Sequence, residues 1–123
     1  LQTISHYNLP IKIFILNNDG YKSIMQTQEN YFSDNFFGCN PQSGITFPDF
    51  RKVAYAFNFK YEYVSYTYYV RECIEDTLSR SGPIICEVYL DPKYIFQPKL
   101  LSKNSRGTIV SPSLENMFPF LNE

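Results

Sequence analysis

The polar turn Asn17, Asn18, Asp19 and Gly20 is the stretch of this 123-residue chain that is best suited to chemistry. Its glycine lets the backbone approach a ligand closely. Asparagine carboxamides and backbone carbonyls are hard oxygen donors of the kind that Mg²⁺ accepts, with waters and substrate phosphates completing its octahedron. A helix that starts after the turn would present free N–H groups, which attract phosphate. These residue types therefore indicate a site for Mg²⁺ and a diphosphate.

Two elements must hold this turn in place. Before it, residues 11–16 form an apolar and β-branched run without in/out alternation, typical of a strand covered on both faces in a parallel sheet. After it, residues 21–32 are rich in Gln, Met and Glu, which favours a helix. The inner face of this helix would carry Ile24, Met25, Gln28 and Phe32. Such a βα unit places its loop at the carboxyl end of the sheet. An Asp-Gly pair between apolar runs is also a hairpin signal, and on these residues alone that alternative stays open.

The turn and its flanks resemble the acetolactate synthase-like family of thiamine diphosphate-dependent enzymes. Residues 17–21 look like the end of the family's thiamine diphosphate motif, which opens with Gly-Asp-Gly and closes with Asn-Asn. The other similar stretches are residues 7–12, residues 26–29, the helix start at Pro48, Asp49 and Phe50 with Ala54, Ala56 and Phe57 after it, and residues 82–92. The likeness therefore runs from Leu1 to about Pro92, which is most of the chain.

The resemblance implies a parent enzyme that uses thiamine diphosphate and Mg²⁺ to make or break a bond next to the carbonyl of a 2-keto acid. In this chain Asn18 would donate a side-chain oxygen to Mg²⁺ and Gly20 its backbone carbonyl. The cofactor-binding residues would be Asn17, Asn18, Asp19, Gly20, Tyr21 and Ser23. Asn17 and Asp19 would shape the turn, and the backbone from Tyr21 onward would meet the diphosphate. Ser23 would either touch a phosphate oxygen or act as an ordinary first-turn or capping residue. No catalytic residue is assigned.

The resemblance also implies what lies outside the chain. The Gly-Asp-Gly half of the motif is expected upstream of Leu1. The family's activating glutamate is expected from the pyrimidine-binding domain of a neighbouring subunit, so the parent protein is expected to be a homo-oligomer. The 123-residue chain alone is therefore expected to show no turnover and little cofactor affinity.

Two positions depart from the patterns of related enzymes. The pyruvate decarboxylase branch has a catalytic glutamate where this chain has Ile24, which cannot transfer protons, so a simple keto-acid decarboxylase is only the runner-up. Typical acetohydroxyacid synthases have a tryptophan where this chain has Thr27, so the acceptor substrate stays open. An alternative from another class is a non-catalytic α/β module whose aromatic surface binds a protein.

Composition excludes several classes of partner. The net charge is −1 and the basic residues are scattered, which argues against binding to nucleic acid or an anionic membrane. The three cysteines, Cys39, Cys73 and Cys86, are an odd number without CxxC spacing, which argues against a disulfide scaffold or a zinc site. This number and spacing of cysteines fit a reducing, cytoplasmic compartment. The apolar runs are too short to span a membrane, and the first residues lack a signal peptide pattern.

The whole pattern predicts an α/β fold with three layers and a mostly parallel sheet, which would be the later half of a thiamine diphosphate-binding domain. That domain would cover residues 1–91, and residues 92–123, which show no hydrophobic period, would be a C-terminal tail and not a second domain. The remaining predicted elements are a helix end at 1–8, a loop at 33–47, a helix from 48, a strand at 61–65, a helix at 69–81 and a buried strand at 83–90. The inner face of the 69–81 helix would carry Val70, Cys73, Ile74, Thr77 and Leu78. Within the tail, residues 114–121 are apolar enough to dock onto another surface.

Overall fold

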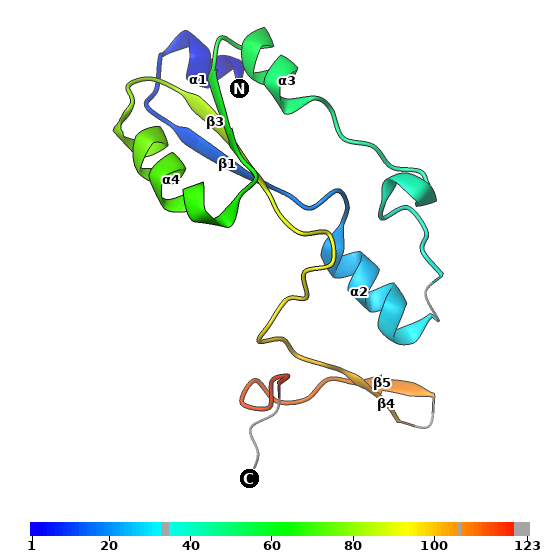
Figure 1. Cartoon of the computed structure of the whole chain (residues 1–123). Helices are drawn as coiled ribbons and strands as arrows, with labels where there is room; N and C mark the ends of the chain where they lie inside the picture. Colours follow the sequence, from blue (N-terminus) through cyan, green and yellow to red (C-terminus); the bar gives the residue numbers. More distant parts are fainter. Residues whose placement is uncertain (33–34, 106, 120–123) are drawn as a thin grey trace. The chain divides into compact units, whose positions relative to one another are not determined.

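The computed structural model describes residues 1–32, 35–105 and 107–119. Their contacts divide the chain into two compact units, Leu1–Lys93 and Tyr94–Glu123. The first unit holds most of the secondary structure, and Figure 1 shows its elements in sequence colours. The polar turn singled out in the sequence belongs to this first unit.

A three-stranded parallel sheet forms the centre of the first unit. Its strands are β1 (Lys12–Asn17), β2 (Lys60–Val64) and β3 (Ile84–Tyr89), and their order in the sheet is β1-β3-β2. Both outer strands run parallel to β3, so all three carboxyl ends meet at one edge. The predicted parallel sheet is therefore confirmed, with the last strand along the chain in the middle.

In the described part of the chain, one α-helix precedes β1, two lie between β1 and β2, and one lies between β2 and β3. These helices are α1 (Gln2–His6), α2 (Lys22–Tyr31), α3 (Phe50–Ala56) and α4 (Val70–Ser79), with short 3₁₀ turns at Pro41–Ser43 and Thr67–Tyr69. α3 begins where the sequence predicted, because the Asp49 carboxylate accepts a hydrogen bond from the Lys52 N–H at 3.1 Å. α4 ends at Ser79, with Arg80 as its C-cap, and Gly82 follows with φ 79°, a conformation that glycine adopts without strain.

Successive residues of β3 point to opposite faces, and a different helix covers each face. Ile85 packs with Ala54 of α3 and with Phe59. Cys86 and Val88 pack with Val64, and Val70 and Cys73 of α4 lie against them. α3 and α4 therefore lie on opposite sides of the sheet (Figure 1), which confirms the α/β, three-layer architecture.

The burial predicted for β1 is wrong in part. No residue of this strand is fully buried, and Leu16 is 64% exposed. The reason is that β1 pairs only with β3 among the described residues, so it is an outer strand. Phe14 packs against the α4 side, and Ile13 and Ile15 against the α3 side. Leu16 lies near the carboxyl end of the strand, where it remains in contact with solvent.

The predicted inner face of α2 is wrong in part, since Met25 and Gln28 are half-buried as predicted but Ile24 and Phe32 are not. Its buried residues are Lys22 and Gln26, whereas Ile24 and Phe32 are 44% and 56% exposed. The reason is that α2 contacts the polar segment around residues 37–43: the Gln28 side chain donates to the Phe37 carbonyl at 3.1 Å and accepts from the Phe37 N–H at 3.0 Å. Polar side chains therefore mediate its packing. Ser33 and Asp34 of the predicted loop lie outside the described residues.

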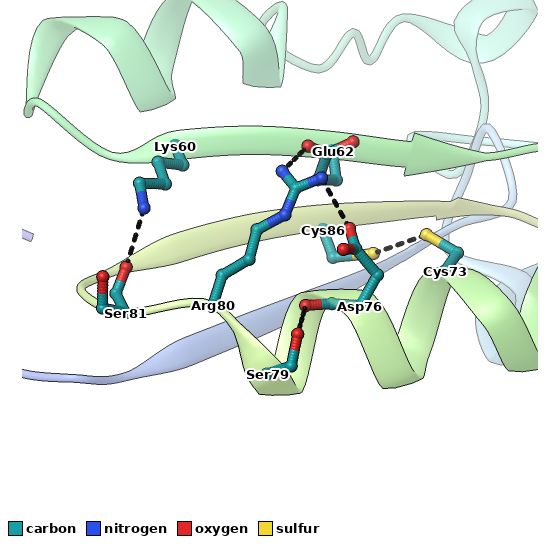
Figure 2. Close-up of polar contacts among 8 residues, drawn as sticks. All are labelled: Lys60, Glu62, Cys73, Asp76, Ser79, Arg80, Ser81 and Cys86. Carbon is teal, nitrogen blue, oxygen red and sulfur yellow. Dashed lines mark hydrogen bonds and ion pairs between the residues drawn. The ribbon is translucent and has the colours of Figure 1, made fainter.

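A polar cluster joins α4 to β2 near the amino end of the sheet (Figure 2). Arg80 forms ion pairs with Glu62 of β2 and, at 2.6 Å, with Asp76 of α4. The Cys73 and Cys86 sulfur atoms lie 3.8 Å apart as free thiols between helix and strand. Cys86 is fully buried and Cys73 is partly buried, so both side chains pack between α4 and the sheet.

Ile85→Ala should lower the free energy of unfolding by about 3 kcal/mol, measured by urea denaturation, because it empties a 2%-exposed position in the sheet. Leu78→Ala is the matched control. The sequence placed Leu78 on the inner face of its helix, but the side chain is 58% exposed, so this substitution should cost less than about 0.5 kcal/mol. Equal losses from both substitutions would contradict the helix orientation described above.

Cys86 should react with iodoacetamide at pH 8 about 100-fold more slowly in the folded chain than in urea, because only the thiolate reacts. Desolvation by burial raises the pKa of Cys86 to about 11. This pKa is raised on folding, so the associated stability is full below about pH 9 and is lost as the pH rises toward 11. Mass spectrometry of the labelled peptides measures the rate. Equal labelling rates in the two states would show that the thiol is not sequestered.

The second unit contains structure that the sequence did not predict. β4 (Lys103–Ser105) and β5 (Thr108–Val110) pair as an antiparallel ribbon. Lys99 and Phe118 form a further bridge through two backbone hydrogen bonds. The sequence interpretation assigned no strand to this segment; the ribbon was missed because its strands are short and lack apolar alternation. Leu114 is 70% exposed, and Phe120 and Leu121 of the apolar segment lie outside the described residues.

Candidate functional site

The predicted turn follows β1 directly and leads into α2. β1 ends at Asn17 and α2 begins at Lys22, so residues 18–21 connect a strand to a helix. The neighbour of β1 is the parallel strand β3, which is far along the chain, so the hairpin alternative is wrong. The turn therefore lies at the carboxyl edge of the sheet, the position where parallel α/β folds bind ligands.

Asn17 and Asp19 give the turn its shape. The Asn17 side-chain oxygen accepts a hydrogen bond from the Asp19 N–H at 3.0 Å, and Asp19 adopts a left-handed conformation with φ 57°. Asp tolerates this conformation better than most residues because its short polar side chain can interact locally. The Asn17 carbonyl accepts from the Leu90 N–H at 2.8 Å. The backbone before the turn is thereby tied to the end of β3.

Gly20 lies against a carbonyl group of the loop that follows α2. A Cβ atom at this position would come within 2.7 Å of the Cys39 carbonyl oxygen, a distance at which the backbone must move. The same oxygen accepts a hydrogen bond from the Tyr21 N–H at 2.7 Å. Glycine is required at this position because only a residue without a side chain leaves room for the Cys39 carbonyl. No motif or spacing pointed to Cys39, which is fully buried.

The two predicted Mg²⁺ ligands are both available. Within the described part of the chain, the Asn18 carboxamide and the Gly20 carbonyl take part in no hydrogen bond. Both residues line one cavity of about 210 Å³, together with Ile15, Phe47 and Phe50. Neutral oxygen donors of this kind suit Mg²⁺ when phosphate oxygens and a carboxylate complete the coordination. The donor chemistry therefore fits the predicted metal. In the same described residues, no three His, Cys, Asp or Glu side chains form a cluster that could hold a metal.

The start of α2 is open toward an anion. Tyr21 occupies the N-cap position and its side chain makes no capping hydrogen bond, so Ser23 is not the cap. The backbone N–H groups of Lys22, Ser23 and Ile24 have no acceptor among the described residues, as is usual in a first helical turn. Such free N–H groups, with the helix dipole, favour phosphate. Ser23 is exposed beside them.

Glu87 is a site residue that the sequence interpretation missed. It lies on β3 and is 3% exposed. One carboxylate oxygen accepts from the Asn17 side-chain nitrogen at 2.5 Å, and the other from the Tyr61 hydroxyl at 2.5 Å. A lone carboxylate within the apolar run of β3 was the signal that could have identified it, because Glu is seldom buried without partners.

A second cavity of about 480 Å³ borders this carboxylate and the turn. Its lining residues include Asn17, Asp19, Tyr61, Glu87 and Tyr89. Burial and the neighbouring Glu87 carboxylate raise the pKa of Tyr61 above its usual value, so its hydroxyl stays protonated and donates. The same two causes, burial first, raise the pKa of Tyr89. The Arg51 guanidinium lies 5.3 Å from the centre of the Tyr61 ring, a cation–π contact on the α3 side.

The two positions that depart from the family patterns both lie on α2. Ile24 is 44% exposed and carries no group that transfers protons. The Thr27 hydroxyl donates to the Ser23 carbonyl at 3.0 Å within the helix. Neither observation gives the Ile24 or the Thr27 side chain a chemical role. None of the helices in the described ranges is both long enough and apolar enough to cross a bilayer.

Comparisons with known proteins identify the family of this chain. Residues 1–88 match the model of the thiamine pyrophosphate enzyme C-terminal TPP binding domain. The chain is 31% identical over 90 residues to an acetolactate synthase large subunit of Porphyra purpurea, which covers 72% of this chain and 15% of that protein. It is 28% identical over 85 residues to acetolactate synthase 1, chloroplastic, of Zea mays, covering 66% of the chain and 13% of that protein.

A third relative is the acetolactate synthase catalytic subunit, mitochondrial, of Aspergillus candidus, with 26% identity over 93 residues, 76% of this chain and 13% of that protein. The chain thus spans 13 to 15% of the length of these curated relatives. The family match covers most of the first unit, including β1, the turn, α2 and nearly all of β3. By this match the chain belongs to the C-terminal TPP-binding domain family of thiamine pyrophosphate enzymes.

Proposed function

We propose that the full-length protein is an acetolactate synthase-like transferase that uses thiamine diphosphate and Mg²⁺ to form or cleave a carbon–carbon bond of 2-keto acids. Residues 1–91 would be the later part of its diphosphate-binding domain and residues 92–123 its C-terminal part. The observation that carries this proposal is a pair of oxygen donors, Asn18 and Gly20, that border one cavity at the carboxyl end of β1 and that no hydrogen bond among the described residues engages. The open start of α2 adjoins them.

Each residue of the turn has a role in this proposal. The Asn18 side-chain oxygen and the Gly20 carbonyl would hold Mg²⁺, while Asn17 and Asp19 keep the turn in shape. The first N–H groups of α2, from Lys22 to Ile24, would bind diphosphate oxygens, with Tyr21 and Ser23 beside them. When bound, thiamine diphosphate supplies stabilisation of a carbanion at the former carbonyl carbon. This chain then contributes binding and orientation, and any proton transfer would come from residues outside it.

The surroundings of the site are proposed on the same basis. The pyrimidine-binding domain of a neighbouring subunit would complete the site, which makes the protein a homo-oligomer. The outer edge of β1 has no partner strand among the described residues and so offers a place for a further part of the same domain. The three free thiols favour a reducing compartment, and we propose the cytoplasm.

The test is product analysis of the full-length protein with pyruvate, thiamine diphosphate and Mg²⁺. We expect acetolactate, because the exposed Ile24 offers no proton for the simple release of aldehyde. Acetaldehyde as the sole product would favour the decarboxylase alternative. No cofactor-dependent product and no cofactor binding would favour the non-catalytic interaction module.

The isolated 123-residue chain should bind thiamine diphosphate and Mg²⁺ more weakly than micromolar in isothermal titration calorimetry. The physical reason is that, among the described residues, no carboxylate lines the cavity that the two neutral donors border. Titration of the full-length protein under the same conditions is the control. Micromolar binding by the chain alone would show that the site is complete without further residues.

A further inference from the structure

Glu87 is a buried carboxylate whose contacts join all three strands. It is 3% exposed in the central strand β3, and its partners are Asn17 at the end of β1 and Tyr61 on β2. Among the described residues, its carboxylate is in no ion pair. Burying a carboxylate without a cation is costly unless hydrogen bonds satisfy it. Asn17 and Tyr61 therefore stabilise this carboxylate by hydrogen bonds, and Tyr89 interacts with it as well.

The contact with Glu87 fixes which way the Asn17 carboxamide faces. A carboxylate only accepts hydrogen bonds, so the Asn17 nitrogen must point to Glu87 at 2.5 Å. The Asn17 oxygen then points the other way and accepts from the Asp19 N–H at 3.0 Å. Rotation of the amide by 180° would place two acceptors together at Glu87 and would remove the acceptor of Asp19. Glu87 thus determines the hydrogen bond between Asn17 and Asp19, although Glu87 takes no part in that bond.

The consequence extends to the donors on the turn. Asn18 lies between Asn17, which Glu87 orients, and Asp19. The hydrogen bond from the Asp19 N–H to the Asn17 side chain supports the left-handed conformation of Asp19. Asn18 and Gly20 border the cavity of about 210 Å³, and their free oxygens depend on the path of the backbone between them. Building on the function proposed above, we propose that Glu87 is a positioning residue: it orients Asn17 and thereby holds the Asn18 and Gly20 oxygens ready for Mg²⁺. It does not touch the metal.

The first test compares Glu87→Leu with Glu87→Gln in the full-length protein, using calorimetric titration with Mg²⁺ and thiamine diphosphate. Leucine removes the acceptor, so affinity should fall by about 10- to 100-fold, the usual cost of losing a group that orients a metal ligand. Glutamine should retain near-normal affinity, since its oxygen accepts from Asn17 and its nitrogen donates to the Tyr61 oxygen. Tyr61→Phe is the matched control: it removes the other partner of Glu87, leaves the Asn17 contact, and should have a smaller effect than Glu87→Leu.

A donor–acceptor exchange makes the test independent of simple loss of folding. Asn17→Asp alone places two carboxylates face to face, so it should weaken binding at least as much as Glu87→Leu. Adding Glu87→Gln restores a donor opposite the new carboxylate, whose second oxygen still accepts from the Asp19 N–H. The double variant should therefore recover most of the lost affinity. Absence of recovery, or equal damage from Glu87→Gln and Glu87→Leu, would overturn the proposal.

Amide hydrogen exchange of the same protein without cofactor separates this proposal from the function it rests on. The Asp19 N–H should exchange faster in Glu87→Leu than in Glu87→Gln, because only the latter keeps Asn17 oriented. This readout needs no bound metal. If the unaltered protein binds no cofactor while exchange follows this order, the proposed function fails and the positioning role stands. If exchange at Asp19 is equal in the two variants, the positioning role fails.

Discussion

Asn18→Ala should weaken binding of Mg²⁺ and thiamine diphosphate to the full-length protein by at least about 100-fold. Losing a group that merely orients a ligand already costs about 10- to 100-fold, and this substitution removes the proposed ligand itself. The folded chain should keep its stability, because the Asn18 carboxamide takes part in no hydrogen bond among the described residues. Calorimetric titration measures the affinity, and urea denaturation measures the free energy of unfolding.

The matched control is Asn18→Asp, which keeps an oxygen atom at the same reach from the backbone. A carboxylate oxygen also coordinates Mg²⁺, so this variant should bind the metal far better than Asn18→Ala. If Asn18→Ala binds as tightly as the unaltered protein, the side chain is not a ligand. If Asn18→Ala unfolds the chain instead, the carboxamide must have a structural partner that the described contacts do not contain.

The local part of the site could be predicted from the sequence. A polar turn between an apolar strand and a helix depends on neighbouring residues, and the structure confirms that order around Asn17 and Gly20. The parallel sheet and the two-sided packing of β3 also follow from local patterns, since residues 83–90 are apolar with one exception. That exception is Glu87, which belongs to the candidate site.

The remaining part depends on contacts between distant residues. Asn17 and Glu87 are 70 positions apart, and only the order of the strands in the sheet brings them together. The inner face of α2 was wrong in part for a related reason: the helical pattern of Ile24 and Phe32 assumes an apolar partner, whereas α2 meets the polar segment around residues 37–43 through Gln28. A pattern within one element shows which side chains share a face, but not what that face meets.

Gly20→Ala should lower the free energy of unfolding by about 1–3 kcal/mol, the usual cost of forcing extra volume into a closed contact. Its new methyl group would lie 2.7 Å from the Cys39 carbonyl oxygen. That oxygen cannot easily retreat, because the Cys39 N–H donates to the Ser43 hydroxyl at 3.0 Å and the Cys39 thiol to Gln28 at 3.2 Å. Urea denaturation measures the loss. Binding of Mg²⁺ and thiamine diphosphate by the full-length protein should fall as well, because the displaced backbone carries a proposed ligand.

Gly38→Ala separates this steric effect from the conformational cost of replacing glycine. Gly38 has φ 60° and nothing near its missing Cβ, so alanine there is strained without any clash. Both substitutions should destabilise the chain, but only Gly20→Ala should speed hydrogen exchange at the Tyr21 N–H, which donates to the same Cys39 carbonyl. Unchanged exchange at Tyr21 in Gly20→Ala would mean that the loop accommodates the methyl group. The close approach would then not be what requires glycine at the centre of the turn.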